Sequence, residues 1–313
     1  MSSSLQVRRA AAGLVKTHNF SPKAIISTIF GDMIVPHGGS VWLGSLVEAA
    51  KQFDIKEAHA RTSILRLGYE GWLHGVRVGK LSYYGMTEDS LRDYVTSVYG
   101  TPNDSWSGEW FILFTGTADI PKPVYAKLRQ ALVWEGVGQL APHVFVSPSP
   151  DINRVTRILD EFGLTERIQI LKAHPLEGKD PDQIRKMVRV AWAIADIERK
   201  YYTFLERYRP VKQTLDRNED ALDPESSFVI RILLILEYRL IALRDPHLPS
   251  TLLPASWSGH AAFTLCKTLY QQVLPGSEAY LASIVRTLDG PFKPAGPMLW
   301  SRFGGLSEVA IPA

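Results

Sequence analysis

The 313-residue sequence contains one cysteine and no long apolar run. Because Cys266 is alone, the chain can form neither an intrachain disulfide nor a thiolate-based zinc site, which is typical of a reducing cytoplasm. No apolar run approaches the ~20 residues that a membrane helix needs. The run at 232–236, for example, is followed by Glu237 and Arg239. The N-terminal residues also lack the apolar core of a secretory signal. These absences predict a cytoplasmic protein that does not bind a membrane.

Common catalytic and cofactor-binding motifs are absent as well. The sequence has no G-x-S-x-G nucleophile elbow, no H-E-x-x-H zinc motif among its 8 histidines and no Walker A loop. Gly136, Gly138 and Ala141 superficially fit a dinucleotide fingerprint. They follow a predicted helix and precede a strand, however, which is the reverse of what a phosphate-binding turn requires. We therefore expect no catalytic residue, no metal and no cofactor, and predict that the protein is not an enzyme.

The charge of the chain is unevenly distributed. Residues 1–80 carry 10 Lys and Arg against 5 Asp and Glu, a net charge of +5, within a total of +3 for the whole chain. The remaining residues therefore carry a net charge of −2. A basic N-terminal region favours a phosphate-bearing partner such as nucleic acid for that part of the protein.

Residues 21–100 have the pattern of a winged helix-turn-helix. Ser21 followed by Pro22 is a good N-cap and first-turn pair, and Ser45 and Glu48 have capping-box spacing. Two helices joined by a short turn, followed by a basic hairpin, complete the pattern. The predicted elements are a helix from Ser21, a strand at 41–43, a helix over 45–53, a helix over 56–70, a hairpin around Gly79 and Lys80, and a helix over 87–100.

The helix predicted over 56–70 has two different faces. Ala60, Ile64 and Leu67 share one face and should pack against the earlier helices. The other face can enter the major groove of double-stranded DNA, where arginine pairs with guanine and apolar groups meet thymine methyls. Lysine and arginine on the wing can contact phosphates. For any one of these arginines, a merely solvated position is the alternative. The predicted DNA contacts are His59, Arg61, Thr62, Leu65, Arg66, Tyr69, Arg77 and Lys80.

From residue 106 the pattern changes to alternating strands and helices. Over 106–178 the sequence predicts a ferredoxin-like middle domain with three clear strands and a less clear fourth. The predicted strands are 110–116, 142–146 and 168–173, and the predicted helices are 122–133 and 151–162.

The rest of the chain is predicted to be helical, with irregular ends. A helical C-terminal domain is expected over 181–288, because apolar residues recur there at helical spacing. Residues 1–20 are expected to form a flexible basic arm and residues 289–313 a Pro/Gly-rich, extended tail. The predicted fold class is therefore α+β and multidomain. The helices expected in the C-terminal domain are 183–208, 224–244, 257–274 and 277–288.

The ferredoxin-like pattern leaves one enzymatic alternative open. Small nucleases of the Cas2 type use this fold as a dimer and hold a metal through an acid near the end of the first strand. Here that strand ends at Thr115 and Gly116, and the nearest acid, Asp119, lies beyond the turn. A metal-dependent nucleic-acid-processing enzyme is thus the alternative to a DNA-binding regulator.

Several segments together resemble the PaaX-type repressors, regulators of bacterial phenylacetic acid catabolism. The resemblance implies a winged helix, a Cas2-like middle domain and a helical C-terminal domain in a homodimer that binds operator DNA. It also implies that phenylacetyl-CoA, or a related aromatic acyl-CoA, is the effector that releases the repressor from DNA. The segments are GDMIVPHGGSVWLGSL (31–46), ARTSILRLGYEGWL (60–73), RVGKLSYYGMTEDS (77–90), WSGEWFILF (106–114), LVWEGVGQLAPHVFVSPSP (132–150) and RLIALRDPHLPSTLLPASWSG (239–259).

An acyl-CoA effector would need cations for its phosphates and an apolar niche for its acyl end. The best local concentration of such residues is Arg239, Arg244, His247 and Trp257. A structural role for the same segment, with turn-forming prolines and Trp257 in the core, remains an equal alternative.

Overall fold

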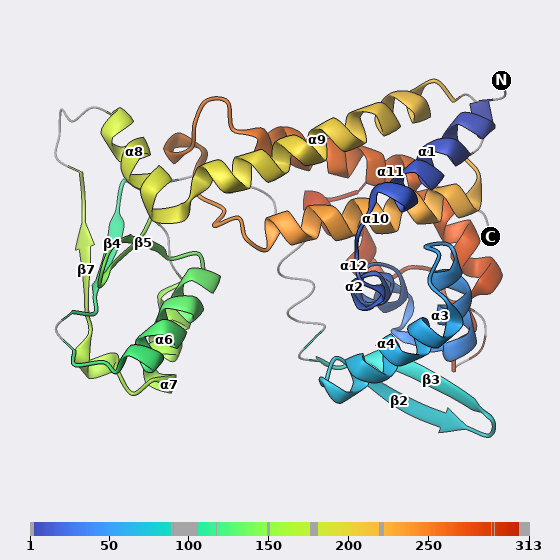
Figure 1. Cartoon of the computed structure of the whole chain (residues 1–313), viewed down its shortest axis with the longest axis horizontal. Coiled ribbons are helices and arrows are strands. Elements are labelled where there is room, and N and C mark those ends of the chain that lie inside the picture. The colour runs from blue at the N-terminus through green and yellow to red at the C-terminus, as the bar shows by residue number, and fades with distance from the viewer. Residues whose placement is uncertain are drawn as a thin grey trace. The chain divides into compact units, whose positions relative to one another are not determined.

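The computed structural model describes residues 3–88, 90, 106–116, 118–148, 151–175, 181–218, 222–288, 290 and 292–306. The chain divides into two compact units (Figure 1). The first comprises residues 1–101, 203–240 and 261–313, and the second comprises residues 102–202 and 241–260. Helices and antiparallel sheets occur in both, which confirms the mixed composition of the predicted α+β class.

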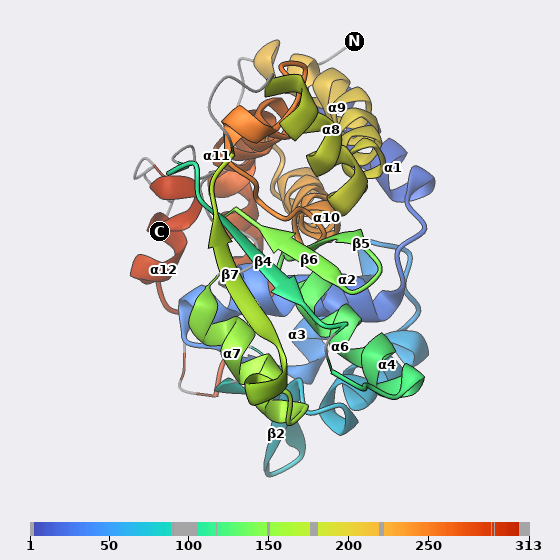
Figure 2. The same ribbon diagram turned by 90° about the vertical axis from the view of Figure 1, so that its left-hand side faces the viewer.

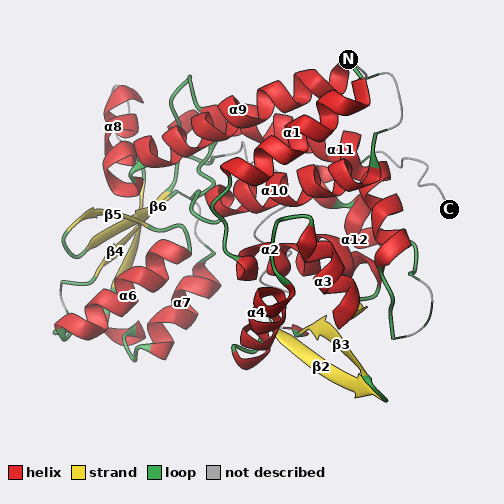
Figure 3. Ribbon diagram, turned by 45° about the vertical axis from the view of Figure 1, so that its right-hand side comes forward, coloured by secondary structure: helices red, strands yellow, loops and turns green. Residues whose placement is uncertain are grey.

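The first unit contains short helices and a small antiparallel sheet near its N-terminus (Figure 3). Ser21 caps the first of the short helices, because its Oγ accepts a hydrogen bond from the Ala24 amide at 3.2 Å. The three strands pair in the order β1-β3-β2. The elements are α1 (Ser3–Thr17), α2 (Pro22–Thr28), the π-helical turn η1 (Ile29–Ile34), the 3-10 turn η2 (Val35–His37), β1 (Ser40–Trp42), α3 (Leu43–Lys51), α4 (Glu57–Tyr69), β2 (Leu73–Val78) and β3 (Leu81–Met86).

Helix α4 buries the face that the sequence predicted. Ala60, Ile64 and Leu67 are at most 1% exposed, and α4 packs against α2 and α3. After α4 the chain turns at Gly71, whose φ of +77° is a backbone conformation that favours glycine. Strands β2 and β3 then form the predicted hairpin, with Val78 paired to Leu81 across the turn. The helix predicted over 87–100 lies almost entirely outside the described residues.

The prediction of a flexible arm at residues 1–20 is wrong for residues 3–17, which form α1. Val7, Ala11 and Leu14 follow one another at helical spacing and are at most 5% exposed. This apolar stripe anchors the helix, while Arg8, on the exposed side, donates to Asp223 at 2.9 Å. The basic residues therefore belong to an ordered amphipathic helix.

The C-terminal part is helical, as predicted, but its helices end elsewhere. Ala193, with a φ of +48°, separates α8 (Pro181–Trp192) from α9 (Ile194–Asp216), where one helix was predicted. The break predicted at Pro275 does not occur, since α11 (Ser258–Ile284) continues through it. Leu274 and Leu281, on either side of the proline, are both buried, and Gly276 lies so close to α10 (Pro224–Ala242) that a Cβ there would be 2.4 Å from Ser227 Oγ. Tertiary packing of both halves therefore outweighs the helix-breaking tendency of the proline.

The prediction of an extended tail at 289–313 is wrong for residues 297–304, which form two short helical segments. Leu299, Arg302 and Phe303 are at most 2% exposed, in α12 (Pro297–Trp300) and the short turn η5 (Arg302–Gly304). The amide of Gly296 donates to the carbonyl of Pro36 at 2.8 Å. The apolar side chains and Arg302 tie the segment into the first unit.

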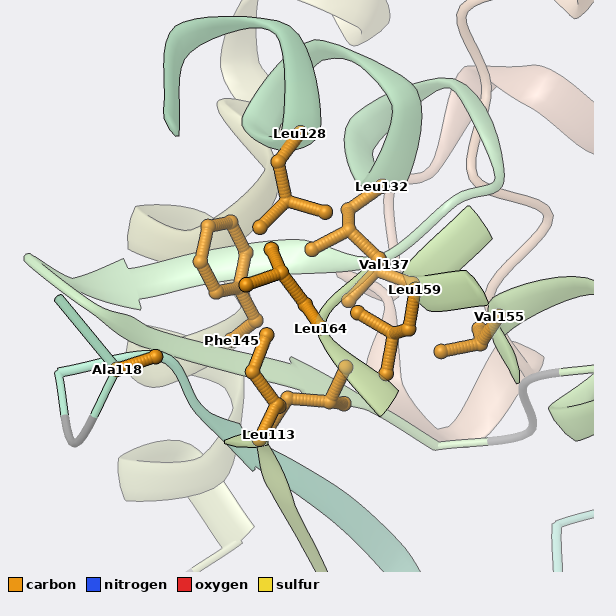
Figure 4. Close-up of a cluster of buried hydrophobic side chains, with 10 residues drawn as sticks. Leu113, Ala118, Leu128, Leu132, Val137, Phe145, Val155, Leu159 and Leu164 are labelled. Atoms are coloured by element: carbon orange, nitrogen blue, oxygen red, sulfur yellow. The ribbon is translucent and has the colours of Figure 1, made fainter. Parts of the chain in front are cut away.

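The second unit contains a four-stranded antiparallel sheet with βαββαβ connectivity. Its strands lie in the order β5-β6-β4-β7 (Figure 2). Leucines of α6 and α7 pack with Leu113 and Phe145 of the sheet in one buried cluster (Figure 4). The elements are β4 (Trp110–Phe114), α6 (Lys122–Trp134), β5 (Gly138–Ala141), β6 (Val144–Ser147), α7 (Ile152–Glu161), the 3-10 turn η3 (Thr165–Arg167), β7 (Gln169–Ala173) and, from the later chain, the 3-10 turn η4 (Ser250–Leu252).

Strand β5 is the fourth strand that the sequence left unclear. It begins at Gly138, where a Cβ would lie 2.5 Å from the indole of Trp192 at the end of α8. The Trp192 indole also donates to the carbonyl of Gly136 at 2.8 Å. Of the glycines that mimicked a dinucleotide fingerprint, Gly138 therefore makes room for a tryptophan on the sheet, and Gly136, with a φ of +78°, forms the turn before the strand. Among the described helices, none combines the length and hydropathy of a membrane span.

Candidate nucleic-acid interface

The exposed face of α4 carries all six residues predicted to contact DNA from that helix. His59, Thr62 and Arg66 are exposed, and Tyr69 is 90% exposed at the C-terminal end. Leu65 is 52% exposed, so an apolar side chain lies on this face beside the polar ones. The helix thus offers cationic, hydroxyl, aromatic and apolar groups to a partner. We define this surface as the α4 face: His59, Arg61, Thr62, Leu65, Arg66 and Tyr69.

The two arginines of the α4 face differ in their contacts. Arg61 is held by Glu57 one turn earlier, with both Nε and Nη2 at 2.8 Å from Glu57 Oε1. For Arg66, no hydrogen bond or ion pair occurs among the described contacts. Because Arg61 must exchange an acidic neighbour for any new partner, Arg66 is the better placed of the two for a bidentate contact.

The β2–β3 hairpin carries the other two predicted residues at its tip. Arg77 and Lys80 are exposed, and Arg77 Nε lies 3.3 Å from the carbonyl of Gly79. Figure 3 shows the hairpin extending away from α3 and α4. Sequence reasoning missed its apolar side: Val76, Val78 and Leu81 are 45%, 50% and 40% exposed. The alternating valines Val76 and Val78 were the signal for this apolar side, but they were interpreted only as a sign of strand propensity.

A buried ionic cluster supports the short helices behind the α4 face. Asp32, in η1, accepts hydrogen bonds from Arg231 Nε at 2.7 Å and from Arg302 Nη1 at 2.8 Å. Tyr270 also donates to Asp32, at 3.2 Å, and burial raises the pKa of this tyrosine. All four side chains are at most 2% exposed. The cluster fixes the segment between α2 and β1 to the helices of the same unit.

Glu278 and His37 extend this cluster. Arg231 donates from Nη1 to Glu278 at 2.5 Å and to Ser277 at 2.9 Å. Burial alone would raise the pKa of Glu278, but Arg231 and the hydrogen bond from His37 outweigh it and lower that pKa to about 2. Two charged residues inside apolar segments, Asp32 and Arg231, were the signal in the sequence that could have revealed this cluster. A charge in such a segment is expected to be buried and therefore needs a buried partner.

The four predicted effector residues are divided between the two units. Arg239 lies in the first unit, is 8% exposed, and has its Nη2 3.5 Å from Ser27 Oγ. Arg244, His247 and Trp257 lie in the second unit. The contacts of Arg239 and those of the other three residues are therefore described for each unit by itself.

Within the second unit, Trp257 has the packing role that the sequence left open. It is 8% exposed and meets the ring of Tyr201 edge-on, with centroids 5.6 Å apart. Arg244 and His247 are exposed. The backbone of His247, with a φ of +49°, forms a turn in which its amide donates to Asp245 at 2.8 Å.

In the sheet of the second unit, the end of the first strand, β4, has a packing and hydrogen-bonding role. Thr115, directly after β4, is fully buried and hydrogen-bonded to His143, with its Oγ1 3.2 Å from the imidazole Nδ1. In the described part of the chain, no group of three or more His, Cys, Asp or Glu residues is arranged to hold a metal ion. Asp119 contributes its carbonyl to Arg167 at 3.0 Å.

Comparisons with known protein families cover most of the chain. Residues 21–90 match the family described as PaaX-like protein. Residues 103–185 match the PaaX protein central Cas2-like domain, and residues 192–283 match the PaaX-like protein C-terminal domain. The α4 face and the hairpin both fall inside the first of these matches.

Two individual proteins are similar to this chain over most of its length. The transcriptional repressor PaaX of Escherichia coli strain K12 is 34% identical over 290 residues, which are 92% of this chain and 91% of that protein. A solved structure, the uncharacterized protein Rv0674 from Mycobacterium tuberculosis, superposes with a TM-score of 0.52 at 19% identity, covering 82% of this chain and 96% of that one. The structural match supports a shared fold.

Proposed function

Because this chain belongs to the PaaX family, we propose that it is a repressor of phenylacetate catabolic genes that binds operator DNA and is released by phenylacetyl-CoA. Residues 21–100 act as a winged helix-turn-helix, in which α4 is the recognition helix and β2–β3 the wing. The protein works in the cytoplasm, where both the DNA and the thioester are found.

The observation that carries the proposal is the α4 face beside the basic hairpin. Arg66 and Arg61 can donate paired hydrogen bonds to guanine in the major groove, and Leu65 can touch a thymine methyl. Thr62 and Tyr69 add hydroxyl groups on the same side of the helix. Arg77 and Lys80 are placed to meet phosphates of the neighbouring minor groove. The buried face of α4 leaves these residues free to bind without disturbing the core.

The protein acts as a homodimer on a roughly palindromic site. A single recognition helix reads too few base pairs for operator-level specificity, so two copies related by a two-fold axis are needed. The half-sites should then be spaced by about one helical turn, ~10 base pairs, or by a multiple of it. Light scattering of the free protein and footprinting of the complex test this. A monomer that protects a single half-site would contradict it.

The thioester, and not the free acid, is the effector. A repressor of a pathway whose intermediates carry CoA gains selectivity if the phosphates of CoA are recognised along with the aryl group. Linkage requires that the ligand bind the DNA-free state more tightly than the DNA-bound state, by a coupling of ~1–3 kcal/mol in typical cases.

The function is tested with the purified chain and labelled promoter DNA from phenylacetate catabolic genes. We expect tight binding in fluorescence anisotropy, release by phenylacetyl-CoA, and no release by phenylacetate or CoA alone. Cleavage of the DNA or of RNA when magnesium or manganese is added would favour the alternative, a metal-dependent nucleic-acid-processing enzyme of the middle domain. Binding without any discrimination against unrelated DNA would also contradict the proposal.

A further inference from the structure

The β2–β3 hairpin turns an apolar side toward solvent. In its register Val76 pairs with Tyr83 and Val78 pairs with Leu81, and the side chains of directly paired residues lie on the same face of a sheet. The two valines and the leucine are between 40% and 50% exposed. The opposite side of β2 begins in the core at Leu73, which is 5% exposed. Neighbouring apolar side chains exposed on one face indicate a surface for a partner. We call the four paired residues the wing face.

The charges around the wing face favour a polyanion as the partner. Residues 71–86 contain no Asp or Glu, and Lys80 lies in the turn between Val78 and Leu81. Arg77 adds a second cation at the same end of the hairpin. An apolar pair flanked by cations fits the minor groove of DNA, where apolar side chains enter the groove and cations meet the phosphates beside it. We propose that Val78 and Leu81 enter the minor groove of the operator and make the wing selective for A·T pairs, an inference that rests on the proposed function.

The base of the hairpin is fixed to the end of α4. The amide of Trp72 donates to the carbonyl of Leu67, in α4, at 2.8 Å. Thr87, directly after β3, closes the base of the hairpin. Its amide donates to the carbonyl of Trp72 at 3.1 Å, and its hydroxyl donates to the carbonyl of Gly71 at 2.8 Å. Because these bonds connect the hairpin to α4, the wing would meet base pairs at a fixed number of steps from those that the α4 face contacts.

The selectivity follows from the one group that distinguishes the base pairs in the minor groove. A G·C pair adds the 2-amino group of guanine there, whereas an A·T pair presents only acceptors. This amino group projects from the floor of the groove and keeps apolar side chains away from it. Val78 and Leu81 also cannot accept a hydrogen bond, so contact with a G·C pair would remove water from a donor without replacing it, which costs free energy. The wing face should therefore disfavour G·C pairs.

The test compares three operator duplexes that differ only at the base pairs beside the half-sites of α4, where footprinting locates the wing. These pairs are A·T in the first duplex, G·C in the second and inosine·cytosine in the third. Inosine lacks the 2-amino group but keeps the major-groove groups of guanine, so a difference between the second and third duplexes arises in the minor groove. Fluorescence anisotropy with the full-length chain measures the three affinities.

Two variants make the wing face polar and keep its cations. Val78→Thr retains a β-branched side chain suited to a strand and replaces a methyl group by a hydroxyl. Leu81→Gln has a similar length and adds an amide oxygen that can accept a hydrogen bond from the guanine amino group. The matched control is Val190→Thr, at a valine of α8 in the second unit that is 68% exposed.

The wild type and the control should bind the A·T and inosine duplexes at least about fivefold more tightly than the G·C duplex, since a change of one base pair commonly has an effect of this size. Both wing variants should lose this preference and still bind the G·C duplex as tightly as the wild type does. A misfolded protein could not give that result.

An unchanged preference in both variants would overturn the inference and leave the proposed function intact, because Arg77 and Lys80 alone would then account for it through groove width. Equal binding of all three duplexes by the wild type would also overturn the selectivity. If the wild type binds none of the duplexes, the proposed function is wrong as well. A smaller mass of the variants in light scattering would instead make the wing face a contact between copies of the chain, and the inference would be wrong.

Discussion

The guanidinium of Arg231 donates from Nε to Oδ2 of Asp32 across 2.7 Å, and neither side chain is exposed to solvent. The two residues are 199 positions apart in the sequence, so the contact joins η1, before the recognition elements, to α10. Two buried charges cost several kcal/mol each to remove from water, and the hydrogen bonds around them offset this cost only while the set is complete. Loss of either residue would therefore leave the other charge buried without this partner and destabilise the fold.

Replacing Asp32 by Asn should lower the free energy of unfolding by ~3–5 kcal/mol, because Arg231 and Arg302 would then lack one of their carboxylates in a dry environment. Chemical denaturation followed by circular dichroism measures this change. The matched control is Lys51→Ala, whose partner Glu48 lies at 2.7 Å on the surface, with side chains 55% and 47% exposed. That pair should contribute no more than ~1 kcal/mol. A loss below 1 kcal/mol for Asp32→Asn would contradict the proposed role of the cluster.

Arg66→Ala should weaken specific operator binding by ~1–3 kcal/mol without lowering the stability of the fold, since each bidentate base contact has this magnitude and the side chain is exposed. Arg61→Ala should weaken it less, because Arg61 gives up its contact with Glu57 when it binds. Gel-shift titrations of the operator measure both effects.

The control for these arginines is Arg157→Ala, an exposed arginine of α7 in the second unit. It should bind the operator as the wild type does. If Arg61→Ala and Arg66→Ala also bind as the wild type does, α4 is not the recognition helix.

Lys80→Ala should weaken binding to all DNA sequences by a similar factor and reduce the salt dependence by about one unit of log K against log salt concentration. The reason is that Lys80, at the exposed tip of the hairpin, is placed to meet a phosphate and carries no sequence information. Anisotropy titrations at several salt concentrations, with operator and unrelated DNA, provide the measurement. Lys186→Ala, an exposed lysine of α8, should leave the slope unchanged. A loss confined to operator DNA would contradict the wing assignment.

Local sequence patterns correctly predicted those secondary-structure elements that depend on interactions between neighbouring residues. The cap at Ser21, the two faces of α4 and the β2–β3 hairpin follow from residues that are neighbours in sequence. The same reasoning failed where contacts between residues distant in sequence determine where a helix ends. Pro275 should end a helix, but α11 continues through it, because Leu274 and Leu281 on either side of the proline are buried against the rest of the unit.

The candidate sites also differ in whether they depend on local or on distant contacts. The α4 face was predictable because one helical period places its residues together. The effector residues were chosen by proximity in sequence, and Arg239 belongs to the first unit while the other three belong to the second. Ser45, which has capping-box spacing, instead donates to the carbonyl of Ile284 at 2.7 Å. No local pattern carries information about a partner 239 residues away.

His18 provides a prediction about pH. Its side chain is 4% exposed, stacks on Phe20 with centroids 4.4 Å apart, and has its Nε2 3.4 Å from the hydroxyl of Tyr208. Burial, together with the charge of Arg207, lowers the pKa of His18 from 6.5 to about 4. Glu237 also faces it, with Oε2 at 3.8 Å. Burial raises the pKa of that carboxyl, although Arg207 opposes the change.

The sign of the effect follows from which state binds the proton. Between pH 6.5 and 4 the unfolded chain protonates His18 and the folded protein does not, so stability is complete above pH 6.5 and falls as the pH is lowered toward 4. The loss from His18 is at most ~3 kcal/mol, while Glu237, with its raised pKa, acts in the opposite direction. His18→Gln should therefore remove the His18 contribution. The difference in unfolding free energy between the wild type and the variant should change with pH inside this window and stay constant outside it. Denaturation at steps from pH 7 to pH 4 measures it, with His174→Gln, whose side chain is 64% exposed, as the control that keeps the wild-type slope. Parallel curves for wild type and His18→Gln across the window would show that His18 titrates as it does in the unfolded chain.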